Sequence, residues 1–300
     1  MAPSEAHNLS EKRRGIVYAL AAAVMFGTAT PFAKYLLGET SPQAMAGLLY
    51  LSSGAGLAIV RALRPGRSTN SLGRKDLPWI TGAVFAGGVT APFLLMNGLQ
   101  RTPASVASLL LNLEAVFTAV IAWLLFGEKF ASRVALGLVA VMAGGILLGW
   151  QGRAQWSDSW GPALVAGACL AWSLDNNLME KISRSDPIQI GMIKGLAAGA
   201  INTLLALTLH AVWPSAAKMV LAGLLGFVGY GVSLVLFVMA LRIIGTTRTI
   251  VSFSVAPFVG ATIGVLIFHE PVTWILLASG FLMAVGVSIT ATAPRTKSVT

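Results

Sequence analysis

Apolar residues occur along the chain in long runs separated by short polar connections. A helix that crosses a bilayer needs about 20 predominantly apolar residues, whereas a membrane strand shows alternation over about ten. Backbone groups in lipid must also satisfy one another, which a helix does within a single segment. The pattern predicts an all-α integral membrane protein with ten transmembrane helices at residues 15–37, 41–61, 77–98, 104–127, 132–150, 161–181, 187–208, 219–241, 246–268 and 272–292.

The composition agrees with a membrane protein. Hydrophobic residues make up 56% of the chain and charged residues 11%, whereas an average soluble domain carries about 25% charged residues. Most connections between the runs are only a few residues long, which leaves no room for a separate soluble domain.

The second half of the chain repeats the hydrophobic pattern of the first. Low-complexity apolar segments also match by accident, so composition bias is the alternative to duplication. Because each half holds an odd number of spans, a duplicated second half would enter the membrane from the opposite side. We expect two inverted five-helix repeats, residues 1–150 and 151–300, each with a short cytoplasmic tail. At a constant offset of 142, the identical pairs are Ala119 and Ala261, Ile121 and Ile263, Leu124 and Leu266, Phe126 and Phe268, Glu128 and Glu270, and Gly144 and Gly286.

The positive charges indicate an orientation. With the N-terminus inside, 16 of the 21 Lys and Arg residues fall in cytoplasmic segments and two, Lys34 and Lys194, fall within spans; three, Arg101, Arg153 and Lys218, lie outside. Cytoplasmic loops of membrane proteins carry an excess of Lys and Arg. Both termini are therefore expected in the cytoplasm. The net charge of +10 is then a topology signal, and a nucleic-acid partner is not expected.

Residues suited to catalysis or metal binding are scarce. The single cysteine, Cys169, excludes an internal disulfide and a cysteine-based metal site, and there are only three histidines. The chain contains no HExxH, GxSxG or GxxxxGK pattern. We therefore expect no catalytic residues, no metal and no cofactor. An intramembrane enzyme would have to depend on Asp175 and Glu114 alone.

The sixth span carries a polar face at its centre. Asp175, Asn176 and Met179 follow Trp172 at spacings of three, four and seven residues, which places them on one side of a helix. A carboxylate at the centre of a membrane helix costs at least about 2.5 kcal/mol, so this face must look into protein or water. A cavity wall is the functional interpretation. A buried polar contact between two helices is the alternative.

The first span places Phe26 at a depth equivalent to that of Trp172. Two aromatic rings on opposite sides of a cavity would suit an organic solute, whereas a Phe26 that packs in the core or faces lipid would carry no such meaning. Tyr50 and Tyr230, near the middle of the second and eighth spans, offer a ring with a donor and an acceptor. Either could line the site or simply pack.

Two further charged residues lie in spans. Glu114 is in the middle of the fourth span, two residues from Asn112. At ~100° per residue their side chains point about 200° apart, so one of them is expected to be structural, and which one is left open. Lys194 could neutralise Asp175 or Glu114, bind a substrate carboxylate, or extend to the cytoplasmic surface.

Prolines mark candidate hinges. Pro31, Pro92 and Pro257 fall within the first, third and ninth expected spans, and a proline inside a helix removes a hydrogen bond. We expect these positions to bend or to permit sliding of half-helices.

The segment Leu109 to Glu128 resembles the most recognisable segment of the EamA-type drug/metabolite transporters, and Ser252 to Glu270 resembles its counterpart in the second repeat. A proline is usual in the family at the position where this chain has Ala115 and, in its second copy, Pro257. The departure at Ala115 puts a hinge at that point of the fourth helix in doubt. The resemblance covers essentially the whole chain.

The resemblance implies two inverted repeats, cytoplasmic termini and a central cavity, with export of amino acids or similar metabolites across a bacterial inner membrane. We expect a secondary transporter that alternates access around a cavity; its residues are Phe26, Tyr50, Asn112, Glu114, Trp172, Asp175, Asn176, Lys194 and Tyr230. The expected partners are a small-molecule substrate and the lipid bilayer. The alternatives are efflux of drugs or lipophilic cations and, more remotely, an integral-membrane enzyme that modifies lipids. Substrate, coupling ion, direction and oligomeric state are left open.

Overall fold

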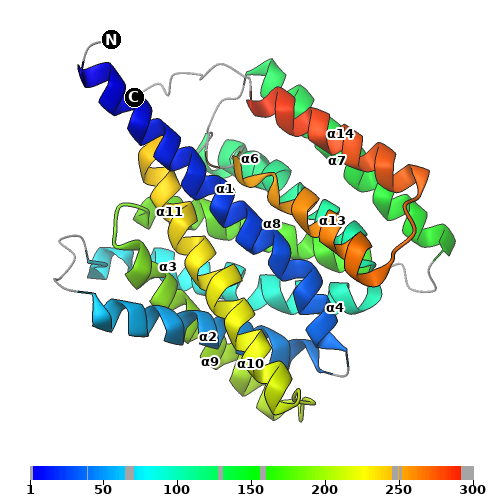
Figure 1. Ribbon diagram of the computed structural model, residues 1–300, viewed down its shortest axis with the longest axis horizontal. Coiled ribbons are helices and arrows are strands. Elements are labelled where there is room, and N and C mark those ends of the chain that lie inside the picture. The colour runs from blue at the N-terminus through cyan, green and yellow to red at the C-terminus, as the bar shows by residue number, and fades with distance from the viewer. Residues whose placement is uncertain are drawn as a thin grey trace.

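The computed structural model describes residues 3–38, 40–64, 71–127, 131–155, 160–244, 249 and 252–291. Within these ranges all regular structure is helical (Figure 1). The elements, in chain order, are α1 (Pro3–Leu37), α2 (Pro42–Leu63), η1 (Arg74–Asp76), α3 (Leu77–Ala83), η2 (Val84–Thr90), α4 (Ala91–Arg101), α5 (Ala104–Leu110), α6 (Leu113–Phe126), α7 (Ser132–Gln155), α8 (Trp160–Ile182), α9 (Pro187–Thr208), α10 (Ala216–Leu225), η3 (Gly226–Val232), α11 (Ser233–Ile244), α13 (Ala256–Phe268) and α14 (Trp274–Ala291).

Seven helical stretches are long and apolar enough to cross a membrane: Glu11–Leu37, Pro42–Leu63, Arg74–Arg101, Ala104–Leu125, Ser132–Trp150, Pro187–Thr208 and Ala216–Ile244. Two shorter apolar helices, Ala256–Phe268 and Trp274–Thr290, lie at the expected ninth and tenth spans. α8 lies at the sixth. The count of ten spans stays a prediction.

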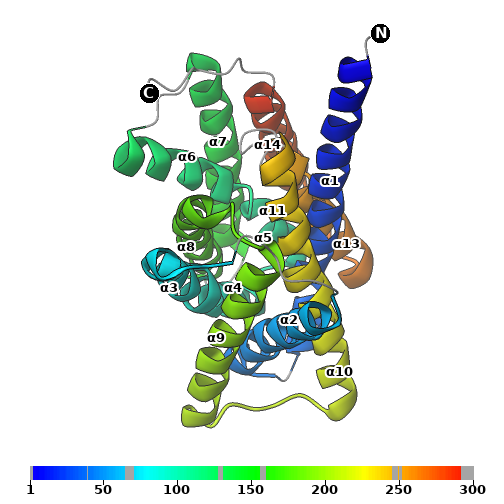
Figure 2. The ribbon, with the colours of Figure 1, turned by 90° about the vertical axis from the view of Figure 1, so that its left-hand side faces the viewer.

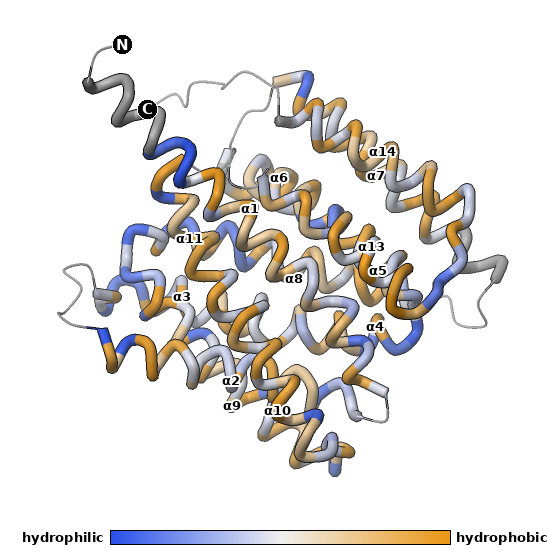
Figure 3. Tube along the Cα trace, viewed as in Figure 1, coloured by the Kyte–Doolittle hydropathy of each residue, from blue (hydrophilic) through white to orange (hydrophobic). Residues whose placement is uncertain are grey.

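The outer surface of the helices is apolar. Leu63, Leu266, Phe281 and Trp274 are 78%, 68%, 69% and 85% exposed, and contiguous apolar surface of this kind is unusual in a protein surrounded by water. Figure 3 shows hydrophobic residues distributed along most helices, with hydrophilic residues gathered near turns and helix ends. The protein is therefore a multi-pass membrane protein.

Helices at corresponding positions in the two halves pack against each other in opposite directions. Along the contact of α2 with α9, Gly47 lies against Thr203 and Gly54 against Gly195, so residue numbers rise along one helix as they fall along the other. α7 and α14 form a second such pair (Figure 1). Antiparallel pairing of equivalent helices is the geometry that an inverted repeat produces.

The other helices of the two halves interleave. α1 lies along α11, with Gly15 against Ile244, and α8 lies along α4, with Gly98 against Val165. α13 also contacts both α1 and α5. Figure 2 shows α1, α11 and α13 close together on one side of the molecule, with α3, α4 and α8 on the other. The space between these groups is the centre of the bundle.

Two π-helical segments occupy equivalent positions. η2 spans Val84–Thr90 and η3 spans Gly226–Val232, and both starts and both ends differ by 142 residues (226 − 84 and 232 − 90). The repeat offset seen in the sequence therefore extends to a local distortion of the backbone. π-helical turns inside longer helices often occur at functional sites.

The expected fourth span is broken. α5 ends at Leu110, a turn at Leu111 and Asn112 follows, and α6 begins at Leu113. The stretch Ala104–Leu125 is still long and apolar enough to be the expected span, but it is not one continuous helix. Asn112 and Glu114 then start a second helix, with the amides of 111, 112, 114 and 115 donating to carbonyls three residues earlier. The helix breaks here without a proline, since residue 115, where a proline is usual in the family, is alanine in this chain.

The three prolines differ in their surroundings. α1 continues through the buried Pro31 without a break in its helical assignment, since neighbouring groups in a membrane bundle can satisfy the carbonyl that a proline leaves free. Pro92 lies in the first turn of α4, directly after η2. Pro257 lies in the first turn of α13, directly after a turn at Ser254 and Val255. A hinge role for any of them stays a prediction.

Candidate functional site

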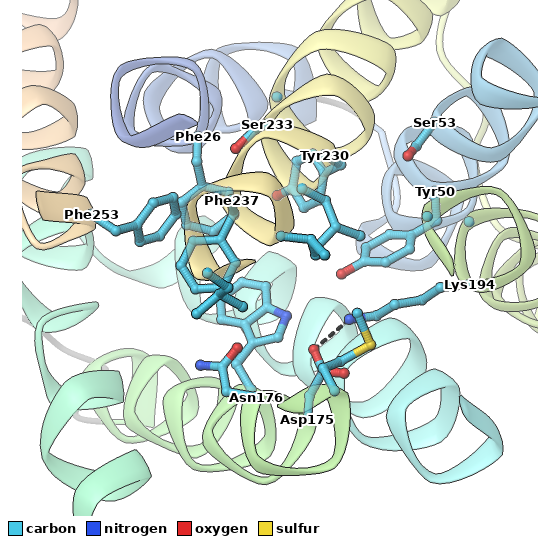
Figure 4. A pocket seen from close by; sticks show the side chains of 18 of the residues that line it. Phe26, Tyr50, Ser53, Asp175, Asn176, Lys194, Tyr230, Ser233, Phe237 and Phe253 are labelled. Atoms are coloured by element: carbon cyan, nitrogen blue, oxygen red, sulfur yellow. Dashed lines mark hydrogen bonds and ion pairs between the residues drawn. The ribbon is translucent and has the colours of Figure 1, made fainter. Parts of the chain in front are cut away.

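A cavity of about 820 Å³, including its open mouth, lies at the centre of the bundle. Its walls come from α1, α2, α6, α8, α9, η3 and α11 (Figure 4). Eight of the nine residues expected at a site border it: Phe26, Tyr50, Glu114, Trp172, Asp175, Asn176, Lys194 and Tyr230. The structure thus brings these residues together around one space; that they bind a substrate stays a prediction.

α8 presents the polar face that its spacing predicted. Trp172, Asp175, Asn176 and Met179 all border the cavity. The indole N–H of Trp172 donates to the backbone carbonyl of Gly87 at 2.9 Å. Figure 4 shows the Trp172 neighbours Asp175 and Asn176 pointing from α8 into the cavity.

The carbonyl of Gly87 is available because of a nearby proline. Pro92 has no N–H, and the N–H of Ala91 bonds to Ala86, so neither residue provides a helical partner for Gly87. The hydroxyl of Tyr50 donates to the same carbonyl at 2.7 Å. One backbone atom of η2 therefore orients two aromatic side chains of the cavity, Tyr50 and Trp172.

Gly87 also leaves room for Asp175. A Cβ at this position would lie 2.1 Å from the Asp175 Oδ2, which is far inside van der Waals contact. The close approach of η2 to α8 therefore requires glycine here.

The aromatic rings of the site form a connected cluster. The ring of Phe26 lies 5.8 Å from those of Trp172 and Tyr230 and 5.5 Å from that of Phe253. The rings of Tyr50 and Tyr230 are 5.3 Å apart. Centroid separations of 4.5–7 Å are those at which aromatic pairs attract. The cluster gives the cavity an apolar wall with polar atoms at its edge.

Lys194 pairs with Asp175. Its Nζ donates to Asp175 Oδ2, and the two side chains are 6% and 5% exposed. Of the alternatives for Lys194, neutralisation of Asp175 is the one observed, and extension to the surface was wrong because the pairing holds the ammonium inside. Asp175 Oδ1 is buried and has no hydrogen-bond partner within the described residues.

Glu114 connects α6 to α8. Its Oε1 accepts from the Asn176 amide at 2.6 Å, and its backbone carbonyl accepts from the Ser173 hydroxyl at 2.8 Å. Asn112 does not border the main cavity. It borders a smaller one of about 450 Å³, and its amide donates to the Leu109 carbonyl at 3.1 Å and to the Met283 sulfur at 3.6 Å. Of these two residues, Glu114 alone borders the main cavity, whereas both border the smaller one; the expected separation of about 200° assumed a continuous helix, which the turn at Asn112 interrupts.

Several residues of the cavity were not expected at the site, among them three polar or aromatic side chains (Figure 4). Phe237 and Phe253, whose rings lie 4.9 Å apart, and Ser53 border it. Helical spacing could have identified two of them, since Ser53 follows Tyr50 by three positions and Phe237 follows Tyr230 by seven. Phe253 directly precedes the turn before α13, and no sequence pattern marked that turn.

The cavity reaches toward one end of the bundle. It extends from Trp172 to Leu241 and Gly191, near the end of α11 and the start of α9, where α1 also begins (Figure 1). At the opposite end the side chains of Leu37, Leu95 and Leu99 are fully or almost fully buried.

Hydrogen bonds join the helices at this closed end, both between the two halves (Glu270) and within the first half (Lys34). Glu270, which follows α13, accepts from the backbone N–H groups of Ala104 and Ser105 at 2.6 and 2.9 Å and from the Ser105 hydroxyl. Lys34 donates to the carbonyls of Leu99 at 2.8 Å and of Thr102. Glu128, the repeat equivalent of Glu270, lies outside the described residues.

No group of three His, Cys, Asp or Glu side chains that could hold a metal ion occurs in the part of the chain that the structure describes. The charged groups of the cavity are Glu114 and the Asp175–Lys194 pair. The arrangement can therefore offer a cation, an anion and aromatic surface to a solute, with no visible set of metal ligands.

Comparisons with known proteins give a family. The model of the EamA-like transporter family matches residues 13–150 and again 159–292. An uncharacterized transporter of Methanothermobacter thermautotrophicus is 27% identical over 92% of this chain and 85% of its own length. The probable 4-amino-4-deoxy-L-arabinose-phosphoundecaprenol flippase subunit ArnE of Yersinia pestis is 36% identical, over 25% of this chain and 64% of its own.

A solved crystal structure has the same fold. It matches with a TM-score of 0.71 over 95% of this chain and 100% of its own, at 20% sequence identity, which is evidence on the fold alone. The family model covers both halves of the chain and most of its length. The protein is therefore a member of the EamA-like transporter family.

Proposed function

We propose that this protein is a secondary transporter that exports amino acids or related small metabolites by alternating access around the central cavity. The observation that carries the proposal is the buried Asp175–Lys194 pair at the edge of an aromatic cavity. A zwitterionic head group complements such a pair: its ammonium can meet the free Oδ1 of Asp175, and its carboxylate can meet the ammonium of Lys194.

The architecture supports alternating access. Corresponding helices run antiparallel, and substrate sites of inverted-repeat transporters lie near mid-membrane where the repeats meet. We propose ten spans in two inverted five-helix repeats, residues 1–150 and 151–300, which rock against each other, with Pro92 and Pro257 as the hinge positions that adjoin backbone distortions.

The open end supports export. The positive-inside count assigns the start of α1 to the cytoplasm, and the cavity extends toward that end. We propose that the structure represents the inward-open state of a bacterial inner-membrane protein with cytoplasmic termini, which loads its substrate from the cytoplasm.

Efflux of organic cations is the second candidate. Glu114 borders the cavity beside Phe26 and Phe253, it forms no ion pair in the described part of the chain, and aromatic faces attract cations. The name of the ArnE relative concerns a lipid-linked sugar, but that match covers a quarter of this chain. No residue of the cavity specifically favours such a substrate.

The test is counterflow of radiolabelled solutes into proteoliposomes that contain the purified protein. We expect exchange of amino acids and its loss in Trp172→Ala and in the charge-neutral double variant Asp175→Asn with Lys194→Gln. Thr262→Val is the control, because Thr262 is exposed on α13 and bonds only its own helix, at Phe258. Competition by lipophilic cations but not by amino acids would reject the proposal in favour of the second candidate.

A further inference from the structure

A second cavity adjoins the central one. Its volume is about 450 Å³ including its open mouth, of which about 40 Å³ is space for the centres of water-sized molecules. The two cavities share five bordering residues: Phe26, Glu114, Asn176, Phe237 and Phe253. Three of these are phenylalanines. The ring of Phe253 contacts both of the others, at centroid distances of 5.5 Å from Phe26 and 4.9 Å from Phe237. The rings therefore border both adjoining cavities.

Among the described residues, two that border the smaller cavity carry buried oxygen atoms without a hydrogen-bond partner. Asn112 Oδ1 and Thr118 Oγ1 are buried without a hydrogen-bond partner in the described part of the protein, and both residues border this cavity. Glu114 lies one helical turn before Thr118 on α6 and borders the cavity too. Buried acceptors without donors are costly, so the three groups together indicate a missing donor.

The missing donor is best supplied by a cation. Within the described residues, the Glu114 carboxylate accepts a hydrogen bond from the neutral amide of Asn176 and forms no ion pair. The neighbouring carboxylate, Asp175, is already paired with Lys194. An ammonium or guanidinium group has several N–H donors and no acceptor, which matches a carboxylate beside two unpartnered oxygens.

The two polar centres are separate. Asp175 and Asn176 are consecutive on α8 and therefore point ~100° apart. Asp175 holds Lys194 in the main cavity, whereas Asn176 holds Glu114 at the boundary of the smaller one. A ligand that satisfies both centres needs a polar group at each end and an apolar stem between them.

From these positions we infer that the smaller cavity is a side-chain subsite for a basic group, so that the preferred substrates are amino acids such as lysine and arginine. The inference rests on the proposed function. The zwitterionic head binds at Asp175 and Lys194, the aliphatic stem lies against the phenylalanine wall, and the distal cation bonds to Glu114, Thr118 and Asn112. A neutral apolar side chain would leave those acceptors unpaired, and sites built to bond a polar group discriminate strongly against analogues that lack it.

The experiment is counterflow in proteoliposomes with labelled arginine, lysine, leucine and phenylalanine. We expect arginine and lysine to exchange in preference to the neutral amino acids. Glu114→Gln keeps an acceptor for Asn176 but removes the charge, and it should weaken apparent affinity for arginine and lysine at least about tenfold relative to phenylalanine, as loss of a charged hydrogen bond implies. Thr118→Val should reduce the same preference by a smaller factor.

Matched controls test whether the effect is specific. Glu180→Gln removes an exposed carboxylate of α8 and Thr262→Val an exposed hydroxyl of α13, and neither residue borders the cavities; both variants should retain the wild-type preference. If Glu114→Gln does not fold, two milder variants provide the same comparison. Glu114→Asp keeps the charge but withdraws the carboxylate by one methylene, and Thr118→Val removes the hydroxyl while Glu114 stays intact.

The outcomes separate the inference from the function it rests on. Exchange of neutral amino acids at least as effective as that of lysine, or an equal effect of Glu114→Gln on both classes, would overturn the subsite and leave amino-acid transport standing. Absence of exchange with every amino acid would overturn the transport proposal itself. A diamine that lacks a carboxylate should compete poorly with lysine; competition as strong as that of lysine would contradict binding of the head group at Lys194.

Discussion

Gly54 and Gly195 meet backbone to backbone where α2 crosses α9. A Cβ on Gly195 would lie 2.5 Å from the Gly54 nitrogen, and no side-chain rotation can relieve a clash with backbone. These helices occupy equivalent positions in the two halves, so the contact sets how closely the halves approach.

Replacing Gly195 by alanine should destabilise the protein by about 1–3 kcal/mol, as overpacking of a tight contact does, even though alanine favours helix. Gly149→Ala is the control, because a Cβ there meets nothing within 4 Å. Thermal unfolding in detergent measures both. Equal melting temperatures for the two variants would contradict the close approach.

The Asp175–Lys194 pair should behave as a unit. Removing either charge leaves the other buried and uncompensated, which costs about 3–5 kcal/mol. We expect the single variants Asp175→Asn and Lys194→Gln each to be less stable than the double variant that carries both changes. A double-mutant cycle of unfolding free energies measures this coupling, and additive effects would show that the pair does not interact.

Glu270 should stabilise the closed end. Glu270→Ala removes the acceptors for the first N–H groups of α5, a loss comparable to deletion of a helix cap at about 1–2 kcal/mol. Hydrogen exchange of the amides of Ala104 and Ser105 should become faster, whereas Glu180→Ala, on the exposed side of α8, should leave it unchanged. Unaltered exchange after Glu270→Ala would exclude this role.

The two donors on the Gly87 carbonyl should be coupled. Tyr50→Phe removes one hydrogen bond and leaves the carbonyl satisfied by Trp172, so it should cost about 0.5–1.5 kcal/mol. Trp172→Phe removes the other bond and some ring volume. With both changes the carbonyl is left without either bond, and the double variant should lose more stability than the sum of the single variants. If the losses of the two single variants add up to the loss of the double variant, the carbonyl has found another donor.

The sequence predicted the helical class and most of the candidate site because both depend on periodicity. The four-residue face of α8 and the depth of Phe26, Tyr50 and Tyr230 follow from spacing along single helices. The choice of partner for Lys194 could not be predicted, because the spacing along single helices does not say whether Asp175 or Glu114 lies within reach of the Lys194 ammonium.

Backbone distortions were the other unpredicted part. Whether a membrane helix breaks depends on which neighbours satisfy its free carbonyls, so the turn at Asn112 without a proline and the uninterrupted course of α1 through Pro31 are tertiary effects. The π-helical turns are likewise absent from any hydropathy pattern, although their shared offset of 142 residues matches the repeat.

The carbonyl of Gly87, which lacks a partner within its own helix, makes the two halves unequal. At the matching position after η3, Leu234 stands where Pro92 stands after η2, and leucine keeps its N–H. The proline that leaves the Gly87 carbonyl without a helical partner therefore has no counterpart after η3. Tyr50 belongs to the same half as Gly87, whereas Trp172 belongs to the other half. If the halves move as proposed, the Trp172 bond crosses the boundary between them and the Tyr50 bond does not.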